Sequence, residues 1–171
     1  DKHRSTRPRL RLSQVAQTLA IYALPVLFAI TLHEAAHGYV ARHFGDMTAH
    51  AQRRISLNPL RHIDLIGTIL IPLAILLVSY GKFLFGWAKP VPVDERNLKN
   101  PKVDMFWIAF AGPLSNLLLA LIGAIALGLF VRFYSPELMA QETGVMQIRE
   151  VFMLFISINV FLAVFDMIPL H

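Results

Sequence analysis

The chain has 171 residues, of which 56% are hydrophobic and only 16% are charged. Soluble domains carry about 25% charged residues, so this composition predicts a membrane protein. The lack of cysteine excludes disulfides, thiolate metal sites and cysteine nucleophiles, so any metal would be held by histidine and carboxylate. The net charge of +5 is carried between long uncharged runs, which is typical of proteins beside a bilayer, and no nucleic-acid partner is expected.

The first hydrophobic segment follows a basic tail at residues 1–11 and is expected to form a helix over 12–41. Its uncharged part, 12–32, is long enough to cross about 30 Å of hydrocarbon. The next segment, 65–93, starts with an apolar run that is marginal for a crossing and contains glycine and proline. It then becomes rich in proline and β-branched residues at 86–93, which predicts a short or re-entrant segment followed by an extended edge-strand loop.

Two further apolar segments are expected to span the membrane, over 105–131 and 146–168. The fold class is therefore an all-α polytopic membrane protein with about four hydrophobic segments. Three are full transmembrane helices and one is short or re-entrant, within a single membrane-embedded domain over 1–171. Basic residues gather between positions 42 and 102, so the positive-inside rule places that region on the cytoplasmic side.

Residues 33–37 read His-Glu-Ala-Ala-His, the H-E-x-x-H pattern. On a helix the two histidines lie on one face and can bind one Zn²⁺, while Glu34 is placed to take a proton from water. Ionisable side chains inside an apolar span are costly unless they are paired or functional, which favours a site over a satisfied core cluster. A catalytic zinc site keeps three protein ligands. From the residues alone, Asp166 is either the third ligand or a neutral structural aspartate.

Five segments, in chain order, resemble the site-2 protease family of intramembrane zinc metalloproteases, particularly its small bacterial type. They are residues 29–38, 57–68, 86–93, 111–116 and 159–170. The resemblance implies a metalloendopeptidase with one Zn²⁺ per chain. It would hydrolyse a peptide bond in or near a transmembrane segment of a protein or peptide substrate, in regulated intramembrane proteolysis. It further implies a multi-pass protein in the lipid bilayer of a bacterial or archaeal inner membrane, with the active site nearer the cytoplasmic face. The oligomeric state stays open.

The resemblance also assigns roles to individual residues. It makes Glu34 the catalytic base and His33 and His37 the zinc ligands, with the third ligand, an aspartate, expected just beyond the last residue. The substrate-binding residues that it implies are Asn116, Trp87, Lys89, Pro90, Val91 and Asp166. Asp166 stands where the family usually has asparagine, and an ionised carboxylate would oppose a developing oxyanion.

Several alternatives stay open at this point. Asn116 could bond to another helix rather than to substrate. The extended loop could add a strand to a substrate by β-augmentation, or be a proline-stiffened connector. The whole protein could be a catalytically impaired homologue that acts as a membrane binding module, which Asp166 favours. It could also be a proton-coupled transporter that uses the His/Glu cluster as a relay.

Overall fold

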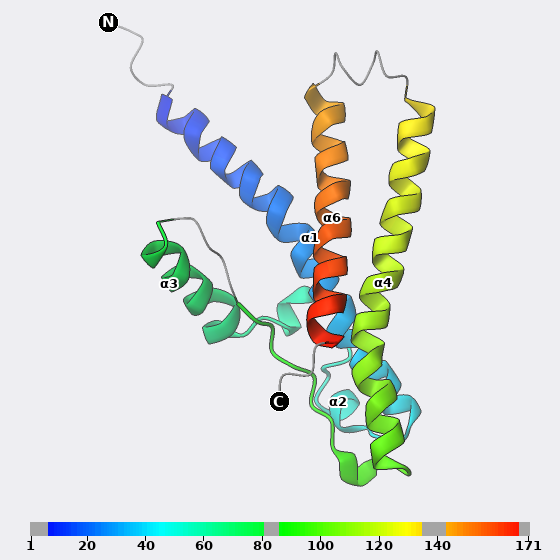
Figure 1. Cartoon of the computed structure of the whole chain (residues 1–171). Helices are drawn as coiled ribbons and strands as arrows, with labels where there is room; N and C mark the ends of the chain where they lie inside the picture. The colour runs from blue at the N-terminus through cyan, green and yellow to red at the C-terminus, as the bar shows by residue number, and fades with distance from the viewer. Residues whose placement is uncertain (1–6, 81–85, 135–142, 168–171) are drawn as a thin grey trace, which may run out of the picture.

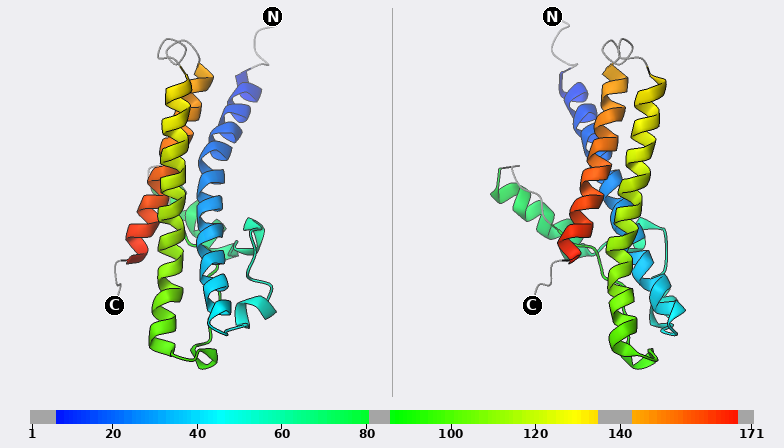
Figure 2. Two further views of the ribbon diagram at one scale, coloured as in Figure 1. Left: turned by 90° about the vertical axis from the view of Figure 1, so that its right-hand side faces the viewer. Right: turned by 45° about the vertical axis from the view of Figure 1, so that its right-hand side comes forward.

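The computed structural model describes residues 7–80, 86–134 and 143–167. Every regular element within these ranges is helical, as the composition predicts. Three long helices form the body: α1 (Arg7–His43), α4 (Pro101–Phe133) and α6 (Thr143–Met167). Figure 1 shows α4 and α6 side by side in opposite directions, with α1 packed against both of them, and Figure 2 shows that α6 ends partway along α4.

Two of the described helices are long and apolar enough to cross a membrane: α4, and Gln147–Met167 within α6. They contain most of the spans expected at 105–131 and 146–168. The third expected span, 12–41, lies within α1, but the side chains of residues 7–22 are outside the described ones, so this crossing stays a prediction. The first six residues of the basic tail also lie outside the described ranges.

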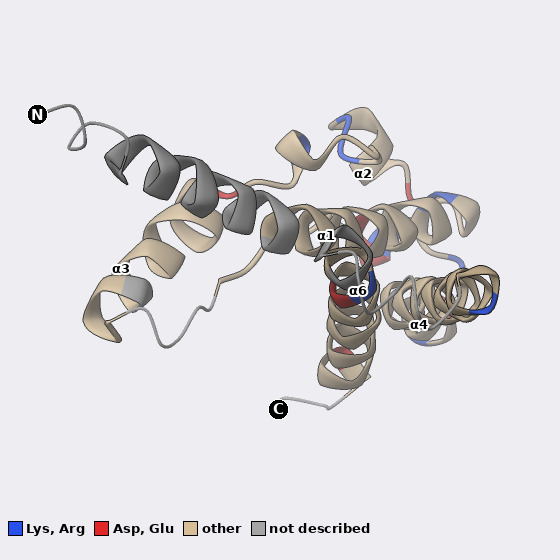
Figure 3. Ribbon diagram, turned by 90° about the horizontal axis from the view of Figure 1, so that it is seen from above, with Lys and Arg blue, Asp and Glu red and all other residues tan. Residues whose placement is uncertain are grey.

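The helix bundle buries small and polar residues and exposes large apolar ones. The residues that α4 buries include Gly112, Ala120 and Gly123, and a Cβ at Gly123 would lie about 3.0 Å from the Phe155 ring of α6. Small residues let helices approach closely where lipid is the solvent, because large apolar side chains gain nothing by leaving it. The outward positions of α4, such as Leu121, are correspondingly exposed. Figure 3 shows that most of the described ribbon carries no Lys, Arg, Asp or Glu.

Helix α1 ends in a Schellman motif at Gly45. The Asp46 N–H donates to the Ala41 carbonyl at 2.9 Å, and the Gly45 N–H donates to the Arg42 carbonyl at 3.1 Å. Gly45 has a φ of 106°, in the left-handed region where glycine lacks the Cβ penalty. The chain then makes the short helices α2 (Thr48–Ala51) and η1 (Pro59–Arg61) beside the end of α1.

The segment expected to be short or re-entrant forms a π-helix, η2 (Leu65–Leu70), followed by α3 (Ile71–Val78). Asp64 caps its start by accepting from the backbone N–H groups of Ile66 and Gly67. The apolar part of this helix, Leu65–Ile75, is below the length of a membrane span. Figure 1 shows α3 projecting sideways from the three long helices.

Residues 86–94 are extended but do not form the expected edge strand. The Trp87 N–H donates to the Gly67 carbonyl at 3.0 Å, and the Lys89 N–H donates to the His62 carbonyl at 2.9 Å. A regular ladder is not formed because Pro90 and Pro92 have no N–H to donate and because the facing segment turns into η2. A short helix, η3 (Glu95–Asn97), then leads into α4.

Candidate metal centre

His33 and His37 bring their Nε2 atoms within 3.0 Å of each other near the middle of the bundle. His33 Nδ1 bonds to the Asn116 Oδ1 atom at 2.5 Å, and His37 Nδ1 bonds to the Ile108 carbonyl at 2.6 Å. Both partners can only accept, so each Nδ1 carries a ring proton, and a neutral ring then has a free lone pair on Nε2. Two such lone pairs at this separation can bind one cation, and imidazole nitrogen is a preferred zinc ligand.

A chain of amides fixes the tautomer of His33. Asn159 Nδ2 donates to the Phe155 carbonyl at 2.8 Å, so Asn159 Oδ1 is left to accept from Asn116 Nδ2, also at 2.8 Å. Asn116 Oδ1 is then the atom that faces His33. Both amides are fully buried. Each group therefore donates to the next, from His33 of α1 through Asn116 and Asn159 to the Phe155 carbonyl of α6.

Gly112 lets the backbone of α4 approach the two imidazoles. A Cβ built there would collide with the Nε2 atoms of both His33 and His37. The two histidines come from one face of α1, whereas the glycine stands on the facing helix. Any larger residue at this position would occupy the space in front of the two Nε2 atoms.

Glu34 lies beside the histidine pair and is held by the extended segment. Its Oε2 atom accepts a hydrogen bond from the Val91 N–H at 2.9 Å. A backbone donor orients the carboxylate without adding a side chain to the site. The arrangement places one carboxylate next to two potential metal ligands, which is part of the set of groups that metal-assisted hydrolysis uses.

Asp166, at the end of α6, reaches the centre from the opposite side. Its Oδ2 atom lies 2.8 Å from His33 Nε2. The described residues nevertheless hold no group of three or more histidine and acidic side chains arranged to bind a metal ion. The two histidines thus fit zinc as a ligand pair. Asp166 adds negative charge at the edge of that pair.

The structure shows the contacts of Asn116, and its expected contact with substrate stays a prediction. Its side chain is fully buried, and its amide bonds to His33, to Asn159 and, at 3.4 Å, to the Ala29 carbonyl. It therefore orients a histidine from behind, which is close to the alternative of a bond across to another helix. Of the expected loop contacts, Trp87 is 46% exposed, whereas Val91 is buried with its N–H on Glu34.

Sequence reasoning did not single out Asn159 or Gly112 for the site. Asn159 is a polar residue inside an apolar run, and this costly placement was the available signal. For Gly112 the sequence offered only its position next to Pro113. A single glycine that lets another helix approach does not produce a repeating pattern in the sequence.

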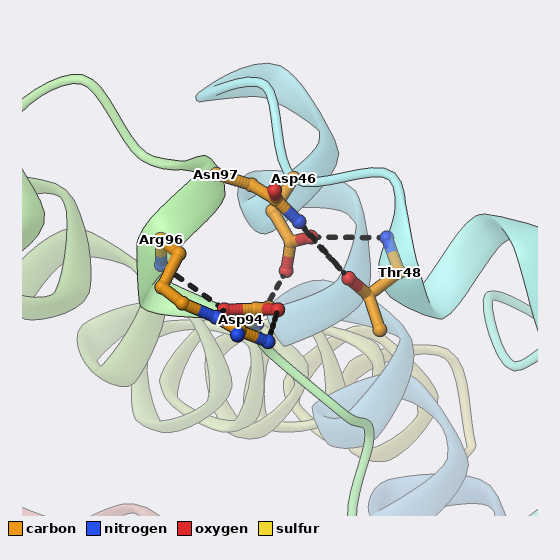
Figure 4. A network of polar contacts seen from close by, with 5 residues as sticks. All are labelled: Asp46, Thr48, Asp94, Arg96 and Asn97. Atoms are coloured by element: carbon orange, nitrogen blue, oxygen red, sulfur yellow. Dashed lines mark hydrogen bonds and ion pairs between the residues drawn. The ribbon is translucent and has the colours of Figure 1, made fainter.

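A polar cluster below the centre, shown in Figure 4, joins the end of α1 to the chain before α4. The buried Asp46 accepts from the Asp94 N–H at 2.8 Å and from Asn97 Nδ2 at 2.9 Å. It also accepts from the backbone and hydroxyl of Thr48. Burial alone would raise the pKa of Asp46, but these hydrogen bonds outweigh it and hold the pKa below its usual value.

Comparison with known proteins finds one informative relative. The protein named "Putative zinc metalloprotease YwhC", from Bacillus subtilis (strain 168), is 42% identical over 147 residues, covering 86% of this chain and 62% of the relative. This similarity supports a zinc metalloprotease family. The chain spans less than two thirds of that relative's length. Neither a family model nor a solved structure matches this chain.

A zinc metalloprotease family agrees with the two imidazoles and the adjacent carboxylate. The relative's name supports the expectation of a zinc-dependent hydrolase, and this support does not depend on the geometry of the H-E-x-x-H residues. The site-2 type, cleavage within the membrane and the number of zinc ions stay predictions.

Proposed function

We propose that this chain is the catalytic part of an intramembrane zinc metalloprotease of the site-2 type. It would hydrolyse a peptide bond in or near a transmembrane segment of a substrate protein. The observation that carries the proposal is the pair of Nε2 atoms of His33 and His37, 3.0 Å apart, with Glu34 beside them, in a bundle whose described outward side chains are largely apolar. The relative's name supports the metal and the reaction class.

The residues present divide the chemistry between them. Zinc held by His33 and His37 would, when bound, supply a Lewis acid that activates water and polarises the scissile carbonyl. The Glu34 carboxylate would take the proton of the attacking water and pass it to the leaving amine. The Val91 N–H keeps that carboxylate in one orientation during both transfers.

The extended segment 86–94 is proposed to bind the substrate backbone. Residues 87, 89 and 91 turn their N–H groups toward the protein, so the other edge carries Ala88, Pro90 and Pro92. Two of these have no N–H, which makes that edge mainly a hydrogen-bond acceptor, and of its carbonyls that of Pro90 already lies 3.4 Å from Arg54 Nη2. An unwound substrate strand would bind it through its own N–H groups.

One observation favours a second function, that of a non-cleaving homologue that binds membrane partners. The carboxylate of Asp166 lies 2.8 Å from His33 Nε2. If it stays ionised there, it places negative charge where the reacting carbonyl oxygen must become negative.

Metal content and cleavage test the proposal in the natural full-length protein, purified in detergent. We expect about one zinc per chain, and cleavage of an epitope-tagged single-span helical substrate. Glu34→Gln should keep the zinc and lose about 10²- to 10⁴-fold in rate, because only the base is removed. His33→Ala should lose both.

His50→Asn is the matched control, since this exposed histidine lies outside the centre, and it should change neither readout. A wild-type protein that holds no zinc would refute the metal site. Zinc at full occupancy with no cleavage would instead favour the binding homologue.

A further inference from the structure

The peptide group between Pro90 and Val91 is hydrogen-bonded at both ends, through its N–H and through its carbonyl. Its N–H donates to Glu34 Oε2 at 2.9 Å. Its carbonyl, which belongs to Pro90, lies 3.4 Å from an Nη2 donor of Arg54. One peptide group thus connects the carboxylate of Glu34, proposed as the base, with the guanidinium of Arg54.

Arg54 holds this part of the extended segment by more than one bond. The same Nη2 atom donates to the Lys89 carbonyl at 2.8 Å, and Nη1 donates to the Arg61 carbonyl at 2.5 Å. The guanidinium therefore links two backbone segments, and its side chain is half-buried. Arg61 in turn donates to the Arg53 carbonyl, which closes the connection.

We propose that Arg54 is a positioning residue for Glu34 and acts through the peptide group between Pro90 and Val91. The inference rests on the proposed function, since Glu34 needs an exact orientation only if it transfers protons. A cation at the carbonyl end polarises the amide and strengthens the N–H bond at its other end. The guanidinium also prevents this peptide from rotating, so the donor keeps facing the carboxylate.

Only arginine has the donors for this task. Its planar fork can satisfy carbonyls of both backbone segments at once, whereas the ammonium of lysine is a compact point charge. The extended segment keeps two other anchors, the Trp87 and Lys89 N–H groups on the Gly67 and His62 carbonyls. Loss of the guanidinium should therefore loosen the peptide next to Glu34 without releasing the segment.

The test compares kcat, KM and zinc content of the full-length, zinc-loaded protein acting on the single-span substrate. Arg54→Ala should lower kcat about 10- to 100-fold, as misplaced catalytic groups typically do, with KM within about twofold and zinc unchanged. Arg54→Lys should recover only part of the loss. Should Arg54→Ala fail to fold, which loss of zinc would reveal, the lysine variant replaces it in every comparison.

Val91→Pro removes the N–H while its neighbours Pro90 and Pro92 already hold the chain extended. We expect Val91→Pro to lower kcat as Arg54→Ala does, and Lys99→Ala, an exposed control outside the segment, to stay near wild type. In the Val91→Pro background, Arg54→Ala should add less than about twofold, because both changes break one connection. If the double variant loses kcat by the full product of the two single losses, the inference is overturned. A change in KM with kcat unaltered would overturn it as well.

Hydrogen exchange of the Val91 amide gives a readout that needs no substrate. Both Glu34→Ala and Arg54→Ala should speed its exchange, while Lys99→Ala, a surface control, should not. Unchanged exchange in Arg54→Ala would refute the connection even if cleavage fell. Faster exchange in a protein that cleaves nothing would keep the geometry and reject the proposed function instead.

Discussion

His33 owes its role to residues that lie far from it in the sequence. Its partner Asn116 is 83 positions away, and the amide that fixes Asn116 is on a third helix. A histidine whose Nδ1 proton is held by a buried amide keeps its Nε2 atom in a fixed orientation. Two other helices thus orient this member of the ligand pair.

Adding one methyl group at Gly112 tests whether zinc binds at the two Nε2 atoms. Gly112→Ala should reduce zinc from about one per chain to near zero, because the new Cβ would collide with both Nε2 atoms. Gly128→Ala is the control on the same helix, since a Cβ there meets nothing within 4 Å. Metal analysis of the two purified variants decides the matter, and full zinc in Gly112→Ala would contradict the position given to the ion.

At the scale of elements, the bundle depends on how the ends of α1 and α4 are joined. Asp46 follows the Schellman turn of α1 directly and bonds to the residues before α4. The extended segment 86–94 lies between these two helices in the chain, and its Val91 N–H donates to Glu34. The Asp46 cluster holds this segment at Asp94, and Arg54 holds it at Lys89 and Pro90.

The lowered pKa of Asp46 predicts acid sensitivity of this junction. Its stabilisation is present above the unfolded value of 3.8 and is lost as the pH falls through the lower folded pKa. Asp46→Asn should cost about 1–3 kcal/mol at neutral pH, because an amide cannot accept from all four donors, and should flatten this part of the pH dependence.

Thermal unfolding in detergent across that pH range measures the effect. Asp94→Asn is the control, because it removes the ion pair with the exposed Arg96, leaves an amide oxygen that can still cap the Arg96 N–H, and keeps the backbone N–H that Asp46 needs. Equal losses in the two variants would show that the buried carboxylate has no special part in the junction.

For the whole molecule, the arrangement of the helices bears on topology. In Figure 1 the end of α1 and the start of α4 lie at the same end of the bundle, and α3, which comes between them in the chain, projects at about mid-height. The connection from residue 44 to residue 100 therefore begins and ends at one end of the bundle. That the segment 65–93 enters the membrane and returns stays a prediction.

Cysteine labelling tests that topology, and the chain has no native cysteine to interfere. Cysteines at Gln52 and Lys99 should react with a membrane-impermeant reagent from the cytoplasmic face, and a cysteine at Tyr134 from the opposite face. Labelling of the first two from different faces would mean that the segment crosses the bilayer completely.

The sequence by itself determined the helical elements and the histidine pair. Long apolar runs predict helices because lipid leaves backbone groups no other partners, and a spacing of four residues places His33 and His37 on one face. Both features depend on residues close together in the chain. Local periodicity reports them directly.

Only the tertiary structure decided which distant groups meet that pair. Asn116 orients His33, Gly112 makes room at Nε2, and Val91 holds Glu34 from 57 positions away. It also turned the expected edge strand into an extended segment without a ladder, because its hydrogen bonds go to the η1–η2 region and to Glu34. Periodicity tells which face a residue occupies. Which segment packs against that face depends on how the helices cross, and no local pattern encodes that.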